Sequence, residues 1–290
     1  MSSLRDLLIA AAAESGGWGY HAGRSSRIEP TCWALLALSD DRPPALELEP
    51  HWRFLARCQR PSGLLVESPE LPPNLAFNGL AALTLQHRSG AVGAAVPALL
   101  AALVRHAGLQ VPQSPNFRQD NSLRGWPWID GTFSWTEPTA WILLALKRAR
   151  KAGLALEGTD ARVAEAERML FDRCCEGGGW NYGNANALGK ALYPYISTTA
   201  LALLALRDQP NEPAVAKSLR YLDQRWPTES SSVSLALTAI CLRSYGAPAQ
   251  RVTAALAARQ DIALKLGNLH AVAAAVAAGS SASHDAAFAV

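Results

Sequence analysis

Three segments of the chain repeat one pattern, and this repetition limits the possible folds more than any other feature. Each segment opens with a Gly-Trp pair, continues through a polar loop and ends in an apolar stretch that closes on Leu-Leu-Ala-Leu. The three segments span 16–38, 125–146 and 177–206. Weaker copies of the apolar stretch occur at 74–85, 230–242 and 268–278. Internal repeats of this kind indicate one structural unit used several times.

Helices of a second kind are expected between the apolar stretches. In 160–173, for example, Val163, Ala166 and Leu170 form one apolar stripe among charged residues. A helix that is apolar on every face must be buried on every side, whereas a helix with a narrow stripe packs on one side only. The alternation therefore predicts an all-α fold, an (α/α)6 toroid in which about six helical hairpins form a double-walled barrel. An open solenoid would show the same alternation, so closure of the ring is an inference.

The domain boundaries follow from the same pattern. We expect a single toroid domain over 1–278 and a flexible tail over 279–290, because the last residues are small and polar. The net charge of +3 comes without a basic run, which argues against nucleic-acid binding. Five cysteines without regular spacing favour reduced thiols and a cytoplasmic location. No apolar run reaches the roughly 20 residues of a membrane-spanning helix.

The Gly-Gly-Trp loops, followed by Thr-rich starts of apolar helices, resemble the prenyltransferase and squalene-oxidase repeat. That repeat occurs in squalene–hopene cyclases, in other class II terpene cyclases and in the β subunits of protein prenyltransferases. The resemblance covers most of the chain and is strongest at 16–38, 125–149 and 177–206. It implies the toroid fold and a central cavity for an isoprenoid or another apolar molecule. A shared fold does not by itself assign a reaction.

The chain departs from the known catalytic members of this superfamily. The Asp-x-Asp-Asp acid motif of class II cyclases is absent, as is the Asp-x-Cys pair that holds zinc in protein prenyltransferases. We therefore predict no metal site and no cofactor. A single-domain member without these motifs is expected to use other acids if it catalyses a reaction.

Three acidic residues are candidates for that chemistry. A Glu-Pro-Thr motif begins at Glu29 and again at Glu137, each at the start of an apolar helix. A first-turn carboxylate can simply complement the helix dipole. If the inner helices run parallel, however, both carboxylates lie at one mouth of the cavity, where an apolar wall could keep one of them protonated. Asp130, within Trp-Ile-Asp-Gly, is the third candidate, although an Asp beside Gly is often a turn residue.

The loops at the same mouth supply candidate substrate-binding residues. Arginines beside helix N-termini could bind an anion, and aromatic faces could stabilise a cation. Solvated surface arginines and core tryptophans are the alternatives. The predicted substrate-binding residues are Tyr20, His21, Arg24, Arg27, Trp128, Trp135, Tyr182 and Tyr193.

Two classes of function follow from these features. We favour a terpenoid-cyclase-like or prenyltransferase-like enzyme that binds an isoprenoid in the cavity, with acid-initiated cyclisation or prenyl transfer as its chemistry. The alternative is a non-catalytic toroid that binds a lipid or peptide, or a scaffold subunit that serves a larger enzyme complex. Contact with a membrane surface and contact with a protein partner are both left open.

Overall fold

All six apolar stretches are helical in the computed structural model, which describes residues 3–39, 46–87, 93–113, 115–116, 118–154, 156–279 and 285–290. They form the inner helices α2 (Ile28–Leu38), α4 (Leu75–Leu85), α7 (Thr136–Lys151), α9 (Ile196–Ala205), α11 (Ser232–Ser244) and α14 (Leu269–Gly279). Burial on all sides is clearest in α2, where every residue except Glu29 is buried.

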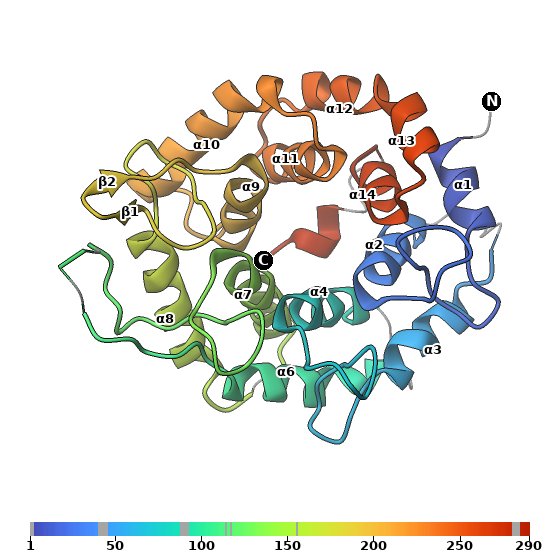
Figure 1. Ribbon diagram of the computed structural model, residues 1–290, viewed down its shortest axis with the longest axis horizontal. Helices are drawn as coiled ribbons and strands as arrows, with labels where there is room; N and C mark the ends of the chain where they lie inside the picture. Colours follow the sequence, from blue (N-terminus) through green and yellow to red (C-terminus); the bar gives the residue numbers. More distant parts are fainter. Residues whose placement is uncertain are drawn as a thin grey trace.

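A second set of helices surrounds the first (Figure 1). These outer helices are α1 (Leu4–Ala10), α3 (Glu49–Arg57), α6 (Ala95–Arg105), α8 (Thr159–Asp172), α10 (Pro213–Arg225), α12 (Gln250–Ala257) and α13 (Gln260–Leu266), and the short 3-10 helix η1 (Trp226–Thr228) follows α10. They pack on one side, as predicted: α8 buries Val163, Ala166 and Leu170, whereas Asp160 and Arg168 are exposed.

The inner helices close into a ring. Helix α14 packs against α11 on one side and against α2 on the other, which joins the end of the repeat series to its beginning (Figure 1). Each inner helix follows an outer helix that returns the chain to the same face, so the inner helices all start at one mouth. The predicted all-α toroid is confirmed, and the open solenoid is excluded.

The Gly-Trp pair fastens each strong repeat in the same way. The indole Nε1 of Trp18 donates to the Leu8 carbonyl at 2.8 Å, which ties the loop to the preceding outer helix. The backbone N–H of Trp18 donates to Thr31 Oγ1 at 2.9 Å, which ties it to the following inner helix. Trp126 and Trp180 repeat both hydrogen bonds with their own neighbours. The tryptophans are fully buried, so these bonds satisfy polar groups that water cannot reach.

The glycines before Trp18 have no room for a side chain. Gly16 has φ +95°, and a Cβ there would lie 2.3 Å from the Pro50 carbonyl oxygen of α3. Glycine is thus required both by the left-handed backbone and by the close approach of the outer helix.

The long loop between α8 and α9 carries the strands that the structure describes. β1 (Asn186–Ala187) and β2 (Lys190–Ala191) pair antiparallel, with Asn186 opposite Ala191 and Ala187 opposite Lys190. The hairpin lies at the outer edge of the ring, beside α10 (Figure 1).

Residues 285–290 form the last part of the segment that the sequence predicts as a flexible tail. The 3-10 helix η2 (Asp285–Phe288) lies inside the ring, and the side chain of Phe288 is only 1% exposed (Figure 1). Ala287 and Phe288 are buried here because the ring leaves space that one phenylalanine and its backbone can fill. Residues 280–284 of the predicted tail lie outside the described residues.

Among the helices that the structure describes, none combines the length and the apolar character needed to cross a bilayer.

Candidate active site

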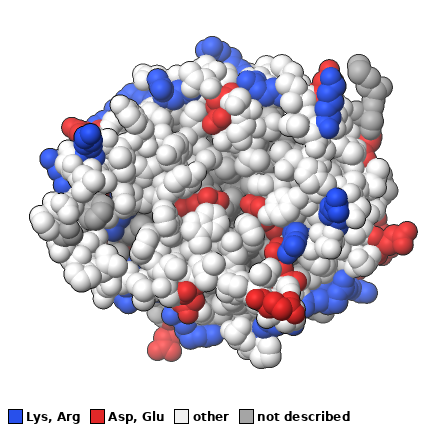
Figure 2. All heavy atoms as spheres, viewed as in Figure 1, with Lys and Arg blue, Asp and Glu red and all other residues white. Residues whose placement is uncertain are grey.

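A pocket of about 180 Å³ opens at the mouth where the inner helices begin. Figure 2 shows a hollow at the centre of this face, with acidic side chains on its walls. Five inner helices and the loop before α11 supply the lining. The lining residues are Glu29, Trp33, Glu137, Trp141, Ser197, Thr198, Leu201, Ser231, Val233, Ser234, Leu237 and His270.

Two repeats contribute an acid and an aromatic ring at the same spacing. Glu29 precedes Trp33 by four residues in α2, and Glu137 precedes Trp141 by four residues in α7. Residues four apart lie on one face of a helix, so each pair presents a carboxylate nearer the mouth and an indole deeper in the pocket. The two indoles meet edge to face, with ring centroids 6.0 Å apart and planes at 79°.

The third strong repeat supplies a neutral version of the same pair. Ser197 and Leu201 of α9 also line the pocket, four residues apart. Thr199 shows that α9 is aligned with the other two repeats. Its hydroxyl accepts the backbone N–H of Trp180. The threonines at the same position of α2 and α7 accept the backbone N–H of the tryptophan in their own repeats. The pocket therefore has an acidic and aromatic side and a hydroxyl and aliphatic side.

Glu29 lies between Tyr20 of the loop before α2 and His270 of α14. Tyr20 Oη donates a hydrogen bond to Glu29 Oε2 at 2.6 Å. Burial, followed by the nearby Glu29 charge, raises the pKa of the Tyr20 phenol well above its usual range, so Tyr20 stays protonated. His270 Nδ1 lies 3.7 Å from the same Oε2 atom, which is beyond a normal hydrogen bond.

Glu137 is kept partly protonated by its surroundings. The pKa of Glu137 is raised from 4.5 to about 7, mainly by burial and secondly by the charge of Glu29. A hydrogen bond with Trp141 opposes this shift. A carboxyl group with a pKa near 7 is populated both as an acid and as a base at neutral pH. This is the property that proton-transfer catalysis requires.

His270 is neutral in this environment. Burial lowers its pKa, against the opposing charge of Glu29. The ring packs against Trp33 with centroids 6.0 Å apart, and Nε2 is buried without a hydrogen-bond partner in the part of the chain that the structure describes. The pocket can therefore hold a proton on Glu137, accept one on Glu29 or His270, and surround an apolar molecule with indole faces.

The structure brings three predicted residues together and leaves the third acid apart. Glu29 and Glu137 line one pocket, and Tyr20 reaches it through Glu29. Asp130 is exposed in its loop and is not among the pocket-lining residues. Its backbone forms part of a turn, which matches the structural alternative for an Asp beside Gly.

The other predicted binding residues lie around the mouth and do not line the pocket. Arg27 pairs with Glu67 at 3.1 Å. Trp128 packs against the core, and Trp135 stacks on a loop phenylalanine at 5.4 Å. The remaining predicted residues, His21, Arg24, Tyr182 and Tyr193, are exposed.

Trp141 and His270 are site residues that sequence reasoning passed over. The signal for Trp141 was present, because Glu-Pro-Thr-x-Trp occurs in both repeats. His270 had no such signal, since its repeat is the least regular of the six. Its place in the pocket follows from ring closure, which sets α14 beside α2.

Larger hollows lie outside the ring, beside the long loop before α7. One of about 790 Å³ is lined by loop residues and Asp172 of α8. Its polar groups are already engaged with one another: Asp172 accepts from the Asp120 N–H, and Asn121 donates to the Pro112 carbonyl. We therefore place the candidate chemistry in the smaller central pocket, where an acid of raised pKa faces apolar walls.

Comparison with known proteins supports the fold. No protein-family model matches the chain, and no curated protein matches its sequence. Solved structures of the type II terpene cyclase MstE from Scytonema are similar in three dimensions. A variant in complex with merosterolic acid A, its product, gives a TM-score of 0.58 at 18% identity, over 94% of this chain and 93% of that chain.

Two further MstE structures give the same result. The apo enzyme matches with a TM-score of 0.57 at 19% identity, over 92% of this chain and 78% of that chain. A second variant, in complex with the substrate geranylgeranyl dihydroxybenzoate, matches with a TM-score of 0.52 at 20% identity, over 90% and 76%. The chain thus shares the α/α toroid fold of this type II terpene cyclase.

Proposed function

We propose that the chain is a terpenoid-cyclase-like enzyme that binds a linear isoprenoid in the central pocket and isomerises it by adding and removing a proton. The observation that carries the proposal is Glu137, a carboxyl group of pKa about 7 on an apolar wall beside two indoles. A carboxylate that only complements the helix dipole would be exposed and ionised, and it would not require aromatic neighbours.

The proposed reaction starts with proton transfer from Glu137. The carboxylic acid gives its proton to one carbon of a terminal alkene, and the alkene electrons form the new C–H bond. The neighbouring carbon becomes a cation, and a second alkene of the same chain attacks it to close a ring. A proton then leaves the cyclic cation for the Glu29 carboxylate. The product is an isomer of the substrate, so no oxidant or co-reactant is consumed.

The indoles of Trp33 and Trp141 would stabilise the cationic intermediates. A cation over an indole face gains about 0.5–2 kcal/mol, and the gain is largest where water is excluded. Both side chains are nearly fully buried, at 1% and 5% exposure, so the pocket meets that condition. Exclusion of water also protects the cation from capture.

The substrate class rests on the lining and on the fold. Apart from the two acids and His270, the pocket offers only hydroxyls, aliphatic groups and indoles. MstE, which shares the fold, was solved with a geranylgeranyl substrate and with its terpenoid product. An apolar chain with internal alkenes matches both observations.

The test uses deuterium. The protein is incubated with geraniol or with farnesol in D2O, and the products are analysed by gas chromatography and mass spectrometry. The proposed mechanism predicts cyclic isomers that carry one deuterium, because the exchangeable acid proton of Glu137 is delivered to carbon. Glu137→Gln should lose about a hundredfold or more in rate, the range of general acid catalysis.

Glu176→Gln is the matched control, because Glu176 is exposed on the outer surface. It should keep the wild-type rate. If geraniol and farnesol both bind but are both recovered unchanged by wild-type protein, the result would contradict the proposal and favour a non-catalytic lipid-binding toroid. Products that form at the wild-type rate in Glu137→Gln would overturn the assignment of the acid.

A further inference from the structure

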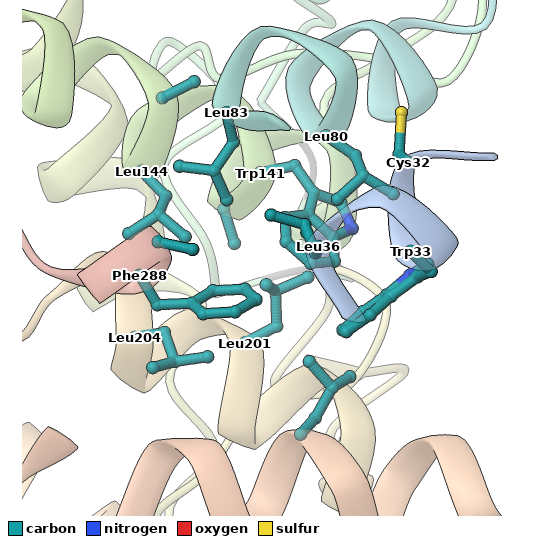
Figure 3. Close-up of a cluster of buried hydrophobic side chains, with 14 of the residues drawn as sticks. Cys32, Trp33, Leu36, Leu80, Leu83, Trp141, Leu144, Leu201, Leu204 and Phe288 are labelled. Carbon is teal, nitrogen blue, oxygen red and sulfur yellow. The ribbon is translucent and has the colours of Figure 1, made fainter. Parts of the chain in front are cut away.

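The bore of the ring below the pocket is filled by the segment 285–290. Figure 3 shows Phe288 among apolar side chains of four inner helices, including Leu36, Leu83, Leu144 and Leu204. Ala287 is 2% exposed and Phe288 is 1% exposed. The segment therefore occupies space that would otherwise continue the pocket along the axis.

Phe288 lies directly behind the two indoles of the pocket. Its ring centroid is 6.1 Å from that of Trp33 and 6.4 Å from that of Trp141. Both tryptophans also line the pocket, so they have the pocket on one side and Phe288 on the other. The three rings together form the floor on which a bound chain would end.

The ring does not depend on this segment for closure. Helix α14 contacts α2 and α11 directly, and the segment follows α14 as a separate insert. The guanidinium of Arg148, in the last turn of α7, donates to the Ala287 carbonyl and holds the segment at the end of the bore opposite the mouth. The inner wall is thus complete without it.

The remaining pocket is small for its proposed ligand class. Its volume of about 180 Å³ lies below the roughly 300–1,000 Å³ of typical small-molecule pockets. The space taken by Phe288 is apolar on all sides, and apolar cavities in proteins stay dry and accept apolar ligands. If Phe288 were removed, the tryptophans could move into the vacated space and deepen the pocket.

We propose that segment 285–290 determines the length of the isoprenoid that the pocket accepts, with Phe288 as the specificity-determining residue behind Trp33 and Trp141. The choice of an isoprenoid as the ligand rests on the proposed function. The limit on its length, which we call the length rule, concerns binding alone. A short chain fits above the floor, and each added isoprene unit must displace Phe288 or stay outside the pocket.

The experiment measures the ratio of two dissociation constants. Isothermal titration calorimetry gives the Kd of geraniol and of farnesol, which differ by one isoprene unit. The proteins are the wild type, Phe288→Ala, Phe288→Leu and a chain that ends at Gly279. In the two Phe288 variants and in the chain that ends at Gly279, the preference for farnesol over geraniol should rise at least about tenfold. The reason is that the additional isoprene unit of farnesol can then be buried.

Phe171→Ala is the matched control. Phe171 is a half-buried phenylalanine of the outer helix α8, so its truncation weakens the core without touching the pocket. Its ratio should equal that of the wild type. Circular dichroism checks that each variant is folded, and Phe288→Leu, the mildest change, carries the test if the shorter chain or Phe288→Ala unfolds.

Three outcomes would overturn the length rule. An unchanged ratio in folded Phe288→Leu and Phe288→Ala would show that the segment does not limit the ligand, while the proposed function would stand on the deuterium experiment. Failure of every protein to bind either alcohol would remove the length rule together with the ligand class. A raised ratio in Phe171→Ala would trace the effect to general loosening of the core.

Discussion

Glu29 raises the pKa of Glu137 across the pocket that both side chains line. Each of the two carboxylates begins an inner helix and precedes an indole by one turn. Their charges are coupled, whereas their surroundings differ: Glu29 accepts a hydrogen bond from Tyr20, and Glu137 is mainly desolvated. The repeat thus places two similar carboxyl groups in different surroundings.

Removal of the Glu29 charge should lower the pKa of Glu137. Burial is the larger cause of the raised value and persists in Glu29→Gln, so the pKa should fall below about 7 but stay above 4.5. Carbon-13 NMR titration of the Glu137 side-chain carboxyl would measure the shift. Glu176→Gln should leave the titration unchanged. A Glu137 pKa that is the same in Glu29→Gln and wild type would show that the two groups are not coupled.

Turnover should depend on the protonated form of Glu137. That form is lost as the pH rises through about 7, so the rate of cyclisation should fall above this pH. The deuterium assay, run across a pH series under saturating substrate, gives the profile of kcat. A rate that rises through the same interval would instead indicate that Glu137 acts as a base.

Glu137 should also make folding stability depend on pH. Its pKa is higher in the folded state than the usual 4.5, so the folded protein binds more protons than the unfolded chain between these values. The contribution is present below about pH 4.5 and lost as the pH rises through about 7, a change of about 3 kcal/mol. Urea unfolding should show Glu137→Gln gaining stability relative to wild type over that interval. A constant difference between the two proteins would contradict the raised pKa.

The indoles should act on the rate more than on binding. Trp33→Leu and Trp141→Leu keep much of the apolar surface but lose the aromatic face, so we expect about a tenfold loss in kcat with a smaller change in KM. Trp→Phe at either position should recover part of the rate. Equal losses in the Phe and Leu variants would point to packing as the only role of these rings.

The Trp–Thr hydrogen bonds should stabilise each repeat. Thr139→Val removes the acceptor of the buried Trp126 N–H and should cost about 1–3 kcal/mol in the free energy of unfolding. Thr136→Val is the matched control in the same helix. Its hydroxyl is buried and has no hydrogen-bond partner among the residues that the structure describes, so valine should be neutral or stabilising there. Similar losses in both variants would attribute the effect to valine itself.

Much of this architecture could be predicted from the sequence, because each strong repeat contains its own local signals. Burial on every face is encoded within a helix such as α2, and the meeting of Glu29 and Glu137 at one mouth follows once the inner helices are parallel. Glu29 and Glu137 do line one pocket, and this could be predicted without knowledge of side-chain contacts.

Other features depend on contacts that are distant in the chain. The burial of Phe288 is set by the width of the bore, which no local pattern reports, and its neighbours in 280–290 are mostly small or polar. His270 reaches Glu29 only because the last inner helix closes on the first. The mouth residues were predicted from residue type and loop position, and these do not say which way a loop side chain points.

In each strong repeat a threonine hydroxyl accepts the backbone N–H of the Gly-Trp tryptophan. The residue two places before this threonine takes no part in that hydrogen bond. That position holds Glu29 in α2, Glu137 in α7 and Ser197 in α9, above the same backbone arrangement each time. The same scaffold therefore carries an acidic group at this position in two repeats and a neutral hydroxyl in the third. A ring of this kind can relocate its reactive group from one helix to the next by single substitutions, and so present the same bound molecule with a proton from a different direction.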